Sequence, residues 1–424
     1  MDSYSPRIVD QELDELMKQL PAIAIEGPKG VGKTATAGRR ATTTYHLDDP
    51  AQRAVIAADP SGPLSAEPPV LFDEWQLVPS VWDAVRRAVD RASPSVRYLL
   101  AGSAAPATVP THSGAGRIVR MRMRPLALSE RNLTTPTVSM RELLSGRRGK
   151  IGGESDVTLA DYATEIVASG LPGVRGLTGR ARRAQLDGYV ARIVDRDFHE
   201  QGHVVRKPAT LRRWLAAYAA ATSTTTSFEK IRLAAEGEKG AGPTTVTVLG
   251  YREVLERLWL LDPVPGWTPS NNSLARLTQA PKHHLADPAL AARLMGIDED
   301  ALMHGKTPGP QAPRDGVLFG RLFESLVTLS ARTYAQAAEA SLHHLRTREG
   351  RHEVDLIVLR EDQRVLAMEV KLSSTVTDDD VQHLHWLREQ IKDDLLDSVI
   401  ITTGSAAFRR TDGIAVVPAA LLGP

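Results

Sequence analysis

The sequence has no cysteine and no apolar run long enough to span a membrane. The absence of cysteine from its 424 residues excludes disulfide bonds, thiolate metal sites and a cysteine nucleophile. No apolar segment approaches the roughly 18 residues that a transmembrane helix needs. The first 20 residues include acidic side chains, where a signal peptide would be apolar. We therefore expect a cytoplasmic protein that makes no membrane contact.

An excess of one charge is also missing. The 52 Lys and Arg residues nearly equal the 51 Asp and Glu residues, so the formal net charge is only +1. A net charge this close to zero gives no indication of nucleic-acid binding, although the chain can still carry a local basic stripe. Aromatic residues make up 5% of the chain and hydrophobic residues 42%. At about 100–200 residues per domain, the length predicts two or three domains with cores of their own.

Apolar, strand-like runs alternate with helical patterns in the first part of the chain. This alternation is typical of a parallel sheet covered by helices, so we predict an α/β fold there. The predicted strands are residues 21–27, 42–47, 68–75 and 96–103, and the predicted helices are residues 9–19, a helix that begins at 32–33, and residues 79–92.

The sequence GPKGVGKT fits the phosphate-loop pattern G-x-x-x-x-G-K-[ST]. Gly27, Gly30 and Gly32 let the backbone curl so that its N–H groups point at phosphate oxygens, and the following helix adds its dipole. Lys33 is expected to bridge the β- and γ-phosphates, and the Thr34 hydroxyl to ligate Mg²⁺. The motif follows an apolar strand and precedes a helix, which is the required context.

A matching acidic pair ends a later strand. In VLFDEW, Asp73 is expected to hold the magnesium shell through water, and Glu74 to orient and activate the attacking water. Ser103 ends the next strand, where it is a candidate to contact that water or the γ-phosphate. The alternative for Ser103 is an ordinary turn serine.

Three arginines alternate in residues 117–125. Arg120, Arg122 and Arg124 share one face of a predicted strand. Either this is an edge strand with a solvated polar face, or the stripe faces phosphate or DNA.

The middle of the chain, residues 158–270, has mostly helical patterns. Residues 244–264 run from a threonine-rich start through an amphipathic helix into an apolar strand, and they resemble a winged helix-turn-helix. An ordinary helical connector explains the pattern equally well. Residues 262–282 are rich in Pro, Gly, Asn and Ser and mark a loop or linker.

The last part of the chain has a different order of elements. We predict a helix, three consecutive strands, a second helix and a further strand, at residues 316–334, 341–347, 353–359, 365–372, 378–391 and 398–404.

Strand alternation places two charged side chains on one face of the third predicted strand, residues 365–372. Glu369 and Lys371 point the same way, and Asp355 lies on the preceding strand. A hairpin can bring Asp355 and Glu369 together as ligands for Mg²⁺ or Mn²⁺, beside Lys371, which is what metal-assisted phosphodiester cleavage needs. Such a carboxylate pair is expected to raise the pKa of both its members when no metal is bound. The alternative is a surface salt bridge on an edge hairpin.

Taken together, these motifs resemble the AAA-type ATPases of bacteria and archaea that carry a functionally unassigned C-terminal region. The resemblance rests on GPKGVGKT, LDDP, VLFDEWQLVP, YLLAGS, GRIVRMRMRPLALSE, SGLPG and HHLADPAL. It implies ATP and Mg²⁺ as cofactors, a Walker A motif ending in Lys33 and Thr34, and a Walker B motif at Asp73 and Glu74. It also implies a sensor-1-like Ser103 and a trans-acting Arg117, hence assembly with other copies of the chain. No clear sensor-2 arginine follows the ATPase core, which departs from the ring-forming pattern.

The C-terminal order resembles the PD-(D/E)XK, or restriction-endonuclease-like, fold. That resemblance assigns Asp355, Glu369 and Lys371 to the nuclease motif and Glu324 to its helical acidic position. The expected domains are a P-loop ATPase domain (1–135), a helical, winged-helix-like domain (136–270) and a nuclease-like domain (271–424).

Three functions follow from this organisation. In the first, an ATP-driven switch binds DNA or RNA through its C-terminal half and cleaves it with a metal ion. In the second, the nuclease-like domain is inactive and only binds a protein or DNA partner. In the third, the chain is a signalling NTPase. The first requires Asp355, Glu369 and Lys371 to converge at metal-binding distance, whereas burial of these residues in salt bridges favours the second.

Overall fold

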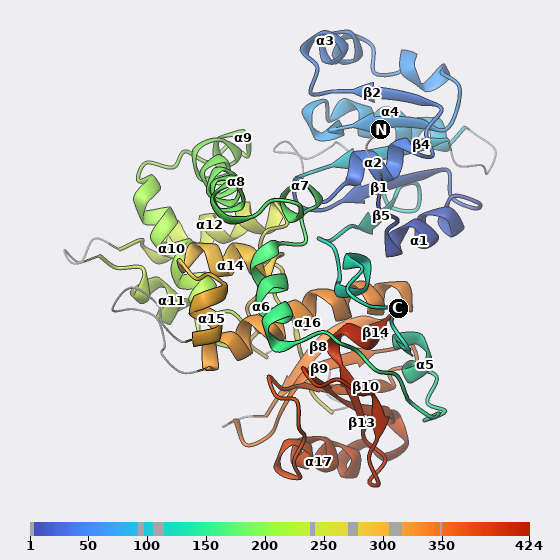
Figure 1. The fold of residues 1–424 in the computed structure, drawn as a ribbon. Coiled ribbons are helices and arrows are strands. Elements are labelled where there is room, and N and C mark those ends of the chain that lie inside the picture. The colour runs from blue at the N-terminus through green and yellow to red at the C-terminus, as the bar shows by residue number, and fades with distance from the viewer. Residues whose placement is uncertain are drawn as a thin grey trace.

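The computed structural model describes residues 4–91, 97–104, 114–237, 242–269, 279–304, 316–347 and 350–424. In this part of the chain, a sheet-containing N-terminal unit, a helical middle unit and a sheet-containing C-terminal unit lie around the long helix α16 (Val317–Ala337) (Figure 1). None of the described helices combines the length and the apolar character needed to cross a membrane.

The N-terminal unit is built on a five-stranded parallel sheet with the strand order β2-β3-β4-β1-β5. The three inner strands are buried along their whole length because helices cover both faces. The predicted parallel α/β architecture is therefore confirmed. Its strands are β1 (Ala22–Glu26), β2 (Thr43–His46), β3 (Val70–Asp73), β4 (Tyr98–Gly102) and β5 (Val119–Arg122). Its helices are α1 (Ile8–Leu16), α2 (Lys33–Gly38), α3 (Pro50–Ala58) and α4 (Ser80–Val89).

Strand β5 is an edge strand, but Arg120, Arg122 and Arg124 of the predicted stripe do not share one environment. Arg124 pairs with Asp262 of the middle unit at 2.9 Å, and Arg332 of α16 contacts the same carboxylate at 2.7 Å. Arg122 lies over the ring of Trp259, 4.0 Å from its centroid. The alternating sequence pattern predicted the strand correctly. The residues that Arg122 and Arg124 contact lie more than 130 positions away in the sequence, so no local pattern indicates them.

The middle unit consists of helices and short extended segments. It begins with α6 (Leu159–Ala168), α7 (Pro172–Arg175), α8 (Gly179–Arg192), the π-helical turn η4 (Ile193–Asp197) and α9 (Phe198–Glu200). It continues with α10 (Pro208–Ala220), α11 (Phe228–Ala234), α12 (Thr245–Arg257), α14 (Pro288–Leu294) and α15 (Glu299–His304).

Three extended segments complete the second half of the middle unit. In space, residues 282–285 lie between residues 223–224 and residues 260–264. In the sequence, α11 and α12 lie between residues 223–224 and residues 260–264. None of these three segments is one of the described strands, so the winged-helix-like character expected of the middle unit stays a prediction. The backbone bonds are Ser223 N to His283 O (2.8 Å), His283 N to Thr224 O (2.8 Å), Val264 N to Lys282 O (2.8 Å) and Lys282 N to Val264 O (2.9 Å).

The C-terminal unit contains a seven-stranded mixed sheet with the order β12-β13-β11-β10-β9-β8-β7. Strands β8, β9 and β10 are antiparallel neighbours, and β11 runs parallel to β10. The predicted order of helix, three strands, helix and strand is thus present. The elements are β7 (Gly266–Trp267), β8 (Ser341–Arg346), β9 (Glu353–Leu359), β10 (Val365–Val370), α17 (Gln382–Ile391), β11 (Leu395–Thr402), β12 (Phe408–Arg409) and β13 (Ala415–Pro418).

The contacts between units differ from the domain boundaries expected at residues 136 and 271. Strand β6 (Val138–Ser139) pairs with β14 (Leu422–Gly423), and α5 (Met140–Leu144) packs against α16 and β11, so this early segment lies with the C-terminal unit. Figure 1 shows α5 beside the C-terminus. Helices α14 and α15 pack against α6, which places them in the middle unit. The composition of the sequence indicated where the linkers lie, but not which unit the segments beside them pack against.

Candidate functional site

The phosphate loop connects β1 to α2 and depends on its glycines. A Cβ atom at Gly27 would lie 2.0 Å from the Met123 carbonyl oxygen, so no side chain fits there. Gly32 has a φ of 101°, a conformation that residues with a side chain rarely adopt. The loop therefore folds as its sequence pattern requires.

Lys33 lies inside this loop and is only 6% exposed. Its ammonium donates to the carbonyl oxygens of Gly27 at 2.9 Å and Pro28 at 2.8 Å. Burial lowers the pKa of Lys33 to about 8, while the nearby Glu74 and Asp73 act to raise it. The loop therefore presents a buried cation whose charge is balanced by the acidic end of β3.

The acidic strand end meets the loop through Thr34. The Thr34 hydroxyl donates to Asp73 Oδ1 at 2.8 Å, and His46 Nδ1 lies 3.4 Å from Asp73 Oδ2. Burial raises the pKa of Asp73, and the hydrogen bond from Thr34 opposes that shift. A hydroxyl beside a carboxylate is a pair of hard oxygen donors, so the residues present fit Mg²⁺.

Glu74 is held by the next strand of the sheet. The Ser103 hydroxyl donates to Glu74 Oε2 at 2.8 Å, and the Gln76 amide donates to the same oxygen. Glu74 itself has a φ of 54°, a strained conformation of the kind found at functional sites. Ser103 thus contacts the carboxylate that is expected to activate water, and its part in hydrolysis stays a prediction.

Arg117 lies apart from this arrangement. Its side chain is 46% exposed and pairs with Asp90 at 2.8 Å. Its contacts in the described structure are with Asp90 and the Ala115 carbonyl oxygen, and none is with the phosphate loop. Its expected action on a neighbouring copy stays a prediction.

The middle unit touches the phosphate loop directly, a contact that the sequence did not predict. The Lys29 ammonium lies 2.7 Å from Asp197 and 3.5 Å from Glu200, at the end of η4 and in α9. The Tyr189 hydroxyl donates to the Lys29 carbonyl oxygen at 3.1 Å, and Arg192 lies 3.5 Å from Asp197. No local signal could have revealed this contact, because Lys29 and Asp197 are 168 residues apart.

A cavity of about 450 Å³ opens beside the loop, between the N-terminal unit and α7. Its walls come from the first residues described, from α2, from the segment after β5 and from α7. Among the lining residues are Tyr4, Gly32, Ala35, Met123, Leu126 and Pro172.

A second cluster surrounds Lys282, which the sequence analysis did not single out. Its side chain is 1% exposed, and its ammonium lies 2.8 Å from Glu324, 3.0 Å from Asp355 and 3.3 Å from Glu353. The predicted convergence of Glu324 and Asp355 is therefore observed, but around a lysine. In the sequence, Lys282 stands between a proline and two histidines in APKHHLADPAL, and nothing in this context indicates its partners.

Glu369 completes the cluster from β10. It is 3% exposed and shares a hydrogen bond with Asp355, and its Oε1 has no hydrogen-bond partner among the described residues. Burial and the adjacent Asp355 raise the pKa of Glu369 well above its usual value. Burial alone would raise the pKa of Asp355 as well, but Lys282 and the Val370 N–H lower it to about 2. The expectation that both pKa values rise was therefore wrong for Asp355.

The predicted metal ligands do not form a metal site in this arrangement. Among the described residues, no group of three His, Asp or Glu side chains is placed to hold a metal ion. The physical reason is that the Lys282 ammonium lies between Glu324 and Asp355. Lys371 does not join the ring around that ammonium, because its own Nζ lies 3.9 Å from Asp380 and is one-third exposed.

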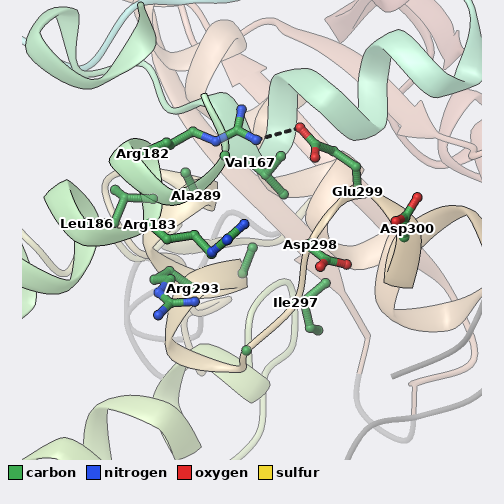
Figure 2. A pocket seen from close by; sticks show the side chains of 13 residues that line it. Val167, Arg182, Arg183, Leu186, Ala289, Arg293, Ile297, Asp298, Glu299 and Asp300 are labelled. Carbon is green, nitrogen blue, oxygen red and sulfur yellow. Dashed lines mark hydrogen bonds and ion pairs between the residues drawn. The ribbon is translucent and has the colours of Figure 1, made fainter. Parts of the chain in front are cut away.

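Another pocket, of about 210 Å³, lies within the middle unit (Figure 2). Arg182 and Arg183 of α8 and Arg293 of α14 face the acidic start of α15 across it. The Arg182–Glu299 pair (2.6 Å) crosses the pocket, and Arg293 pairs with Asp187 at 2.6 Å. Most of the charge in this pocket is thus balanced locally.

Comparison with known proteins gives three matches along the chain. Residues 19–132 match a family described as an AAA domain, residues 159–301 match a domain of unknown function (DUF8612), and residues 319–422 match another (DUF4143). The first match agrees with the parallel sheet and the phosphate loop, and it supports ATP binding and ATPase activity. The second spans α14 and the start of α15, in agreement with their packing.

Two relatives cover nearly the whole chain. They are the uncharacterized proteins Rv2008c of Mycobacterium tuberculosis and Mb2031c of Mycobacterium bovis. Each is 26% identical over 426 residues, which cover 96% of this chain and 82% of the relative. The similarity therefore extends over all three units.

Proposed function

We propose that the chain is an ATP-hydrolysing switch whose middle and C-terminal units bind a partner protein without cleaving nucleic acid. The observation that carries the first half is the convergence of Lys33, Thr34, Asp73, Glu74 and Ser103 at one edge of the parallel sheet. Each has the polar group that its step needs, and each is held by a described hydrogen bond.

The residues divide the work of hydrolysis between them. Lys33 balances the charge of the β- and γ-phosphates, and Thr34 with Asp73 would hold Mg²⁺, which supplies positive charge to the phosphates. Glu74 accepts the proton of the attacking water, and Ser103 keeps its carboxylate in place. The raised pKa of Asp73 is expected to fall when a cation binds beside it.

The cavity beside the phosphate loop can accommodate the base of the nucleotide. Its apolar wall includes Ala35, Met123, Leu126 and Pro172, which suit a flat aromatic base. Because Pro172 belongs to α7, a nucleotide in this cavity touches the middle unit as well as the N-terminal unit. That contact, together with the Lys29–Asp197 pair, supports a switch in which nucleotide state alters how the two units pack.

The surface of α12 favours a protein partner over nucleic acid. In a winged helix the corresponding helix enters the DNA groove, and affinity comes from cations that meet phosphates. Here the exposed side chains of α12 include Val246 (79% exposed) and Leu249 (49%). Its two arginines are engaged, Arg252 over the ring of Phe228 and Arg257 with Glu253 at 3.6 Å.

The C-terminal unit shares the element order of PD-(D/E)XK nucleases, but its carboxylates are bound to Lys282. Catalysis of that class needs a metal ion on these oxygens, and a buried ammonium on the same oxygens opposes it. We therefore infer that this fold serves for binding. Arg117 remains our candidate for acting on a second copy of the chain, because its guanidinium is 46% exposed and contacts only a surface carboxylate and one backbone carbonyl oxygen among the described residues.

ATP binding and turnover by purified Lys33→Ala test the first half of the proposal. We expect nucleotide binding to be lost, because the phosphate charge is left without its buried cation. The exposed Lys18→Ala is the matched control and should behave as wild type. Unchanged affinity and turnover in Lys33→Ala would overturn the assignment.

The second half is tested by incubating the wild-type protein with plasmid and linear DNA, with and without ATP and Mg²⁺ or Mn²⁺. We expect both DNA forms to remain intact. Cleavage that Asp355→Asn abolishes would show instead that the C-terminal unit is a nuclease.

A further inference from the structure

Arg122 lies where the phosphate loop meets the middle unit. It is the last residue of β5, and its register partner on β1 is Glu26, which directly precedes Gly27 of the loop. The next residue, Met123, donates its N–H to the Glu26 carbonyl oxygen at 2.7 Å. The guanidinium of Arg122 therefore belongs to a strand end that is bonded to the beginning of the phosphate loop.

The nearest carboxylate, that of Asp262, is already used by two other arginines. Its Oδ2 accepts a hydrogen bond from Arg124 at 2.9 Å, and its Oδ1 accepts one from Arg332 at 2.7 Å. The Nη2 atom of Arg122 is 3.9 Å from Oδ1, which is too far for a hydrogen bond. The guanidinium of Arg122 lies instead over the ring of Trp259, 4.0 Å from its centroid.

Two donors of Arg122 therefore remain unused. Its Nε and Nη2 atoms are buried and have no hydrogen-bond partner among the described residues. Burial lowers the pKa of Arg122 to about 10, while the charge of Asp262 opposes that shift. A buried donor without an acceptor is costly, and phosphate oxygens are acceptors that suit a guanidinium well.

The charge of Arg122 reaches the centre of the phosphate loop. Burial is the main cause of the lowered pKa of Lys33, and the charges of Lys29 and Arg122 lower it further. Lys33 is the residue expected to meet the β- and γ-phosphates. Arg122 thus lies within electrostatic range of the place where those phosphates would bind.

We propose that Arg122 is a phosphate-sensing residue, which leaves the ring of Trp259 and donates to the γ-phosphate when ATP is bound. With ADP, which has no γ-phosphate, it stays over the ring. Trp259 lies two residues beyond the end of α12, so this movement loosens the N-terminal unit from the helix that carries the exposed Val246 and Leu249. The inference rests on the proposed ATPase function and assigns its signal to one side chain.

The backbone of Trp259 also has an unfavourable conformation. Its φ is 61°, in the left-handed region that bulky residues rarely adopt. Strain of this kind is found in switch regions. Asparagine adopts the same conformation more readily, so Trp259→Asn removes the ring at little backbone cost.

A purely structural contact makes different predictions. If Arg122 only holds the two units together, its removal lowers stability and does not distinguish ATP from ADP. If Arg122 binds the γ-phosphate, its removal weakens the binding of ATP and leaves that of ADP unchanged.

The experiment is calorimetric titration of the full-length chain with ADP and with a non-hydrolysable ATP analogue, both with Mg²⁺. We expect Arg122→Met to bind the analogue about 10–100-fold more weakly than the wild type and to bind ADP equally well. In the wild type, the analogue should change the tryptophan emission and ADP should not. Trp259→Asn should lose that difference.

Arg120→Met is the matched control on the same strand. Arg120 also lies near a tryptophan ring, that of Trp82, 5.2 Å from its centroid. Its side chain is 55% exposed, and Trp82 belongs to the N-terminal unit. Arg120→Met should bind both nucleotides as the wild type does.

The outcomes separate this inference from the proposed ATPase function. A wild-type chain that binds no nucleotide would overturn both. If the wild type binds nucleotide, equal affinities of Arg122→Met and the wild type for the analogue would overturn the inference alone, as would equal losses for the analogue and ADP. A wild-type emission that responds to ADP as it does to the analogue would also overturn it.

Trp259→Asn decides the matter if Arg122→Met does not fold. Arg122 then has no ring to leave, so we expect the analogue to bind about 2–10-fold more tightly than to the wild type. Unchanged or weaker binding of the analogue would overturn the inference.

Discussion

The Lys29 ammonium lies 2.7 Å from the Asp197 carboxylate, which ties a side chain inside the phosphate loop to the π-helical turn of the middle unit. Asp197 is 4% exposed in its side chain, so the pair is shielded on the carboxylate side. Phosphate groups bound at the loop would attract the same ammonium. The strength of this pair therefore bears on how nucleotide state reaches the rest of the chain.

Asp197→Asn should loosen the contact between the N-terminal and middle units. The amide keeps the shape but removes the charge that holds Lys29, so we expect the free energy of unfolding to fall by about 1–3 kcal/mol. Urea unfolding measures this change. Asp195→Asn is the control, because Asp195 pairs with the exposed Arg212 and should change stability by less than about 1 kcal/mol. Equal losses in the two variants would contradict the prediction.

Glu74→Gln should separate nucleotide binding from hydrolysis. The glutamine retains a hydrogen-bond acceptor for Ser103 but cannot take a proton from water, so we expect turnover to fall by about 10²–10⁴-fold with near-normal ATP affinity. Ser103→Ala should cause a smaller fall, because the carboxylate remains but is less well oriented. Single-turnover kinetics and nucleotide titration measure both quantities. The exposed Glu67→Gln serves as control, and rapid hydrolysis by Glu74→Gln would place the base elsewhere.

Asp262→Ala should be among the most destabilising single changes in the chain. Asp262 pairs with Arg124 and Arg332 from the two neighbouring units, and the three guanidinium groups with Arg122 hold the pKa of its carboxyl far below the usual range. Its loss leaves buried cations without a counter-charge, at a cost of about 3–5 kcal/mol. Chemical denaturation tests this, with Asp187→Ala as control since Asp187 is half-exposed. A loss below that of the control would show that the arginines find other partners.

Glu324 should make stability depend on pH near neutrality. Burial raises the pKa of Glu324 to about 8, although the Lys282 ammonium opposes the shift. Between the ordinary value of 4.5 and about 8, the folded chain keeps this proton while the unfolded chain releases it. The free energy of unfolding therefore decreases as pH rises through this window, by at most about 1.4 kcal/mol per pH unit from this group.

Glu324→Gln removes that titration and should flatten the decrease. Urea unfolding at several pH values measures the slope, with the exposed Glu142→Gln as control. A wild-type slope that Glu324→Gln leaves unchanged would mean that Glu324 is ionised in the folded protein at neutral pH.

The sequence was most informative where chemistry and local structure coincide. The phosphate loop needs its glycines next to Lys33 and Thr34, so one contiguous motif determined both the turn and the binding groups. Likewise, the strand that ends at Asp73 and the strand that precedes Ser103 are buried on both faces, and their apolar runs are visible in the sequence. The element order of the C-terminal unit followed from the same periodicities.

The sequence was least informative about ion pairs between residues that are far apart in the chain. Lys282 meets Asp355 across 73 residues, and Lys29 meets Asp197 across 168. Neither lysine lies in a pattern that shows its partner, because ion pairs between units have no periodicity. The periodicity brought Glu324 and Glu369 close to Asp355, but it could not show the Lys282 ammonium, which lies between Glu324 and Asp355 where a metal ion was predicted.

Because β6 pairs with β14, the chain can be cut between these strands and the two pieces still hold together. Residues 138–144 are anchored to the C-terminal unit by that pairing, and further by Arg141 to the Ala337 carbonyl oxygen and Arg148 to that of Leu395. A protease that cleaves after residue 150 would produce two polypeptides that remain bound to each other. An intact assembly in native electrophoresis, accompanied by two bands after denaturation, is the expected signature of such a nick.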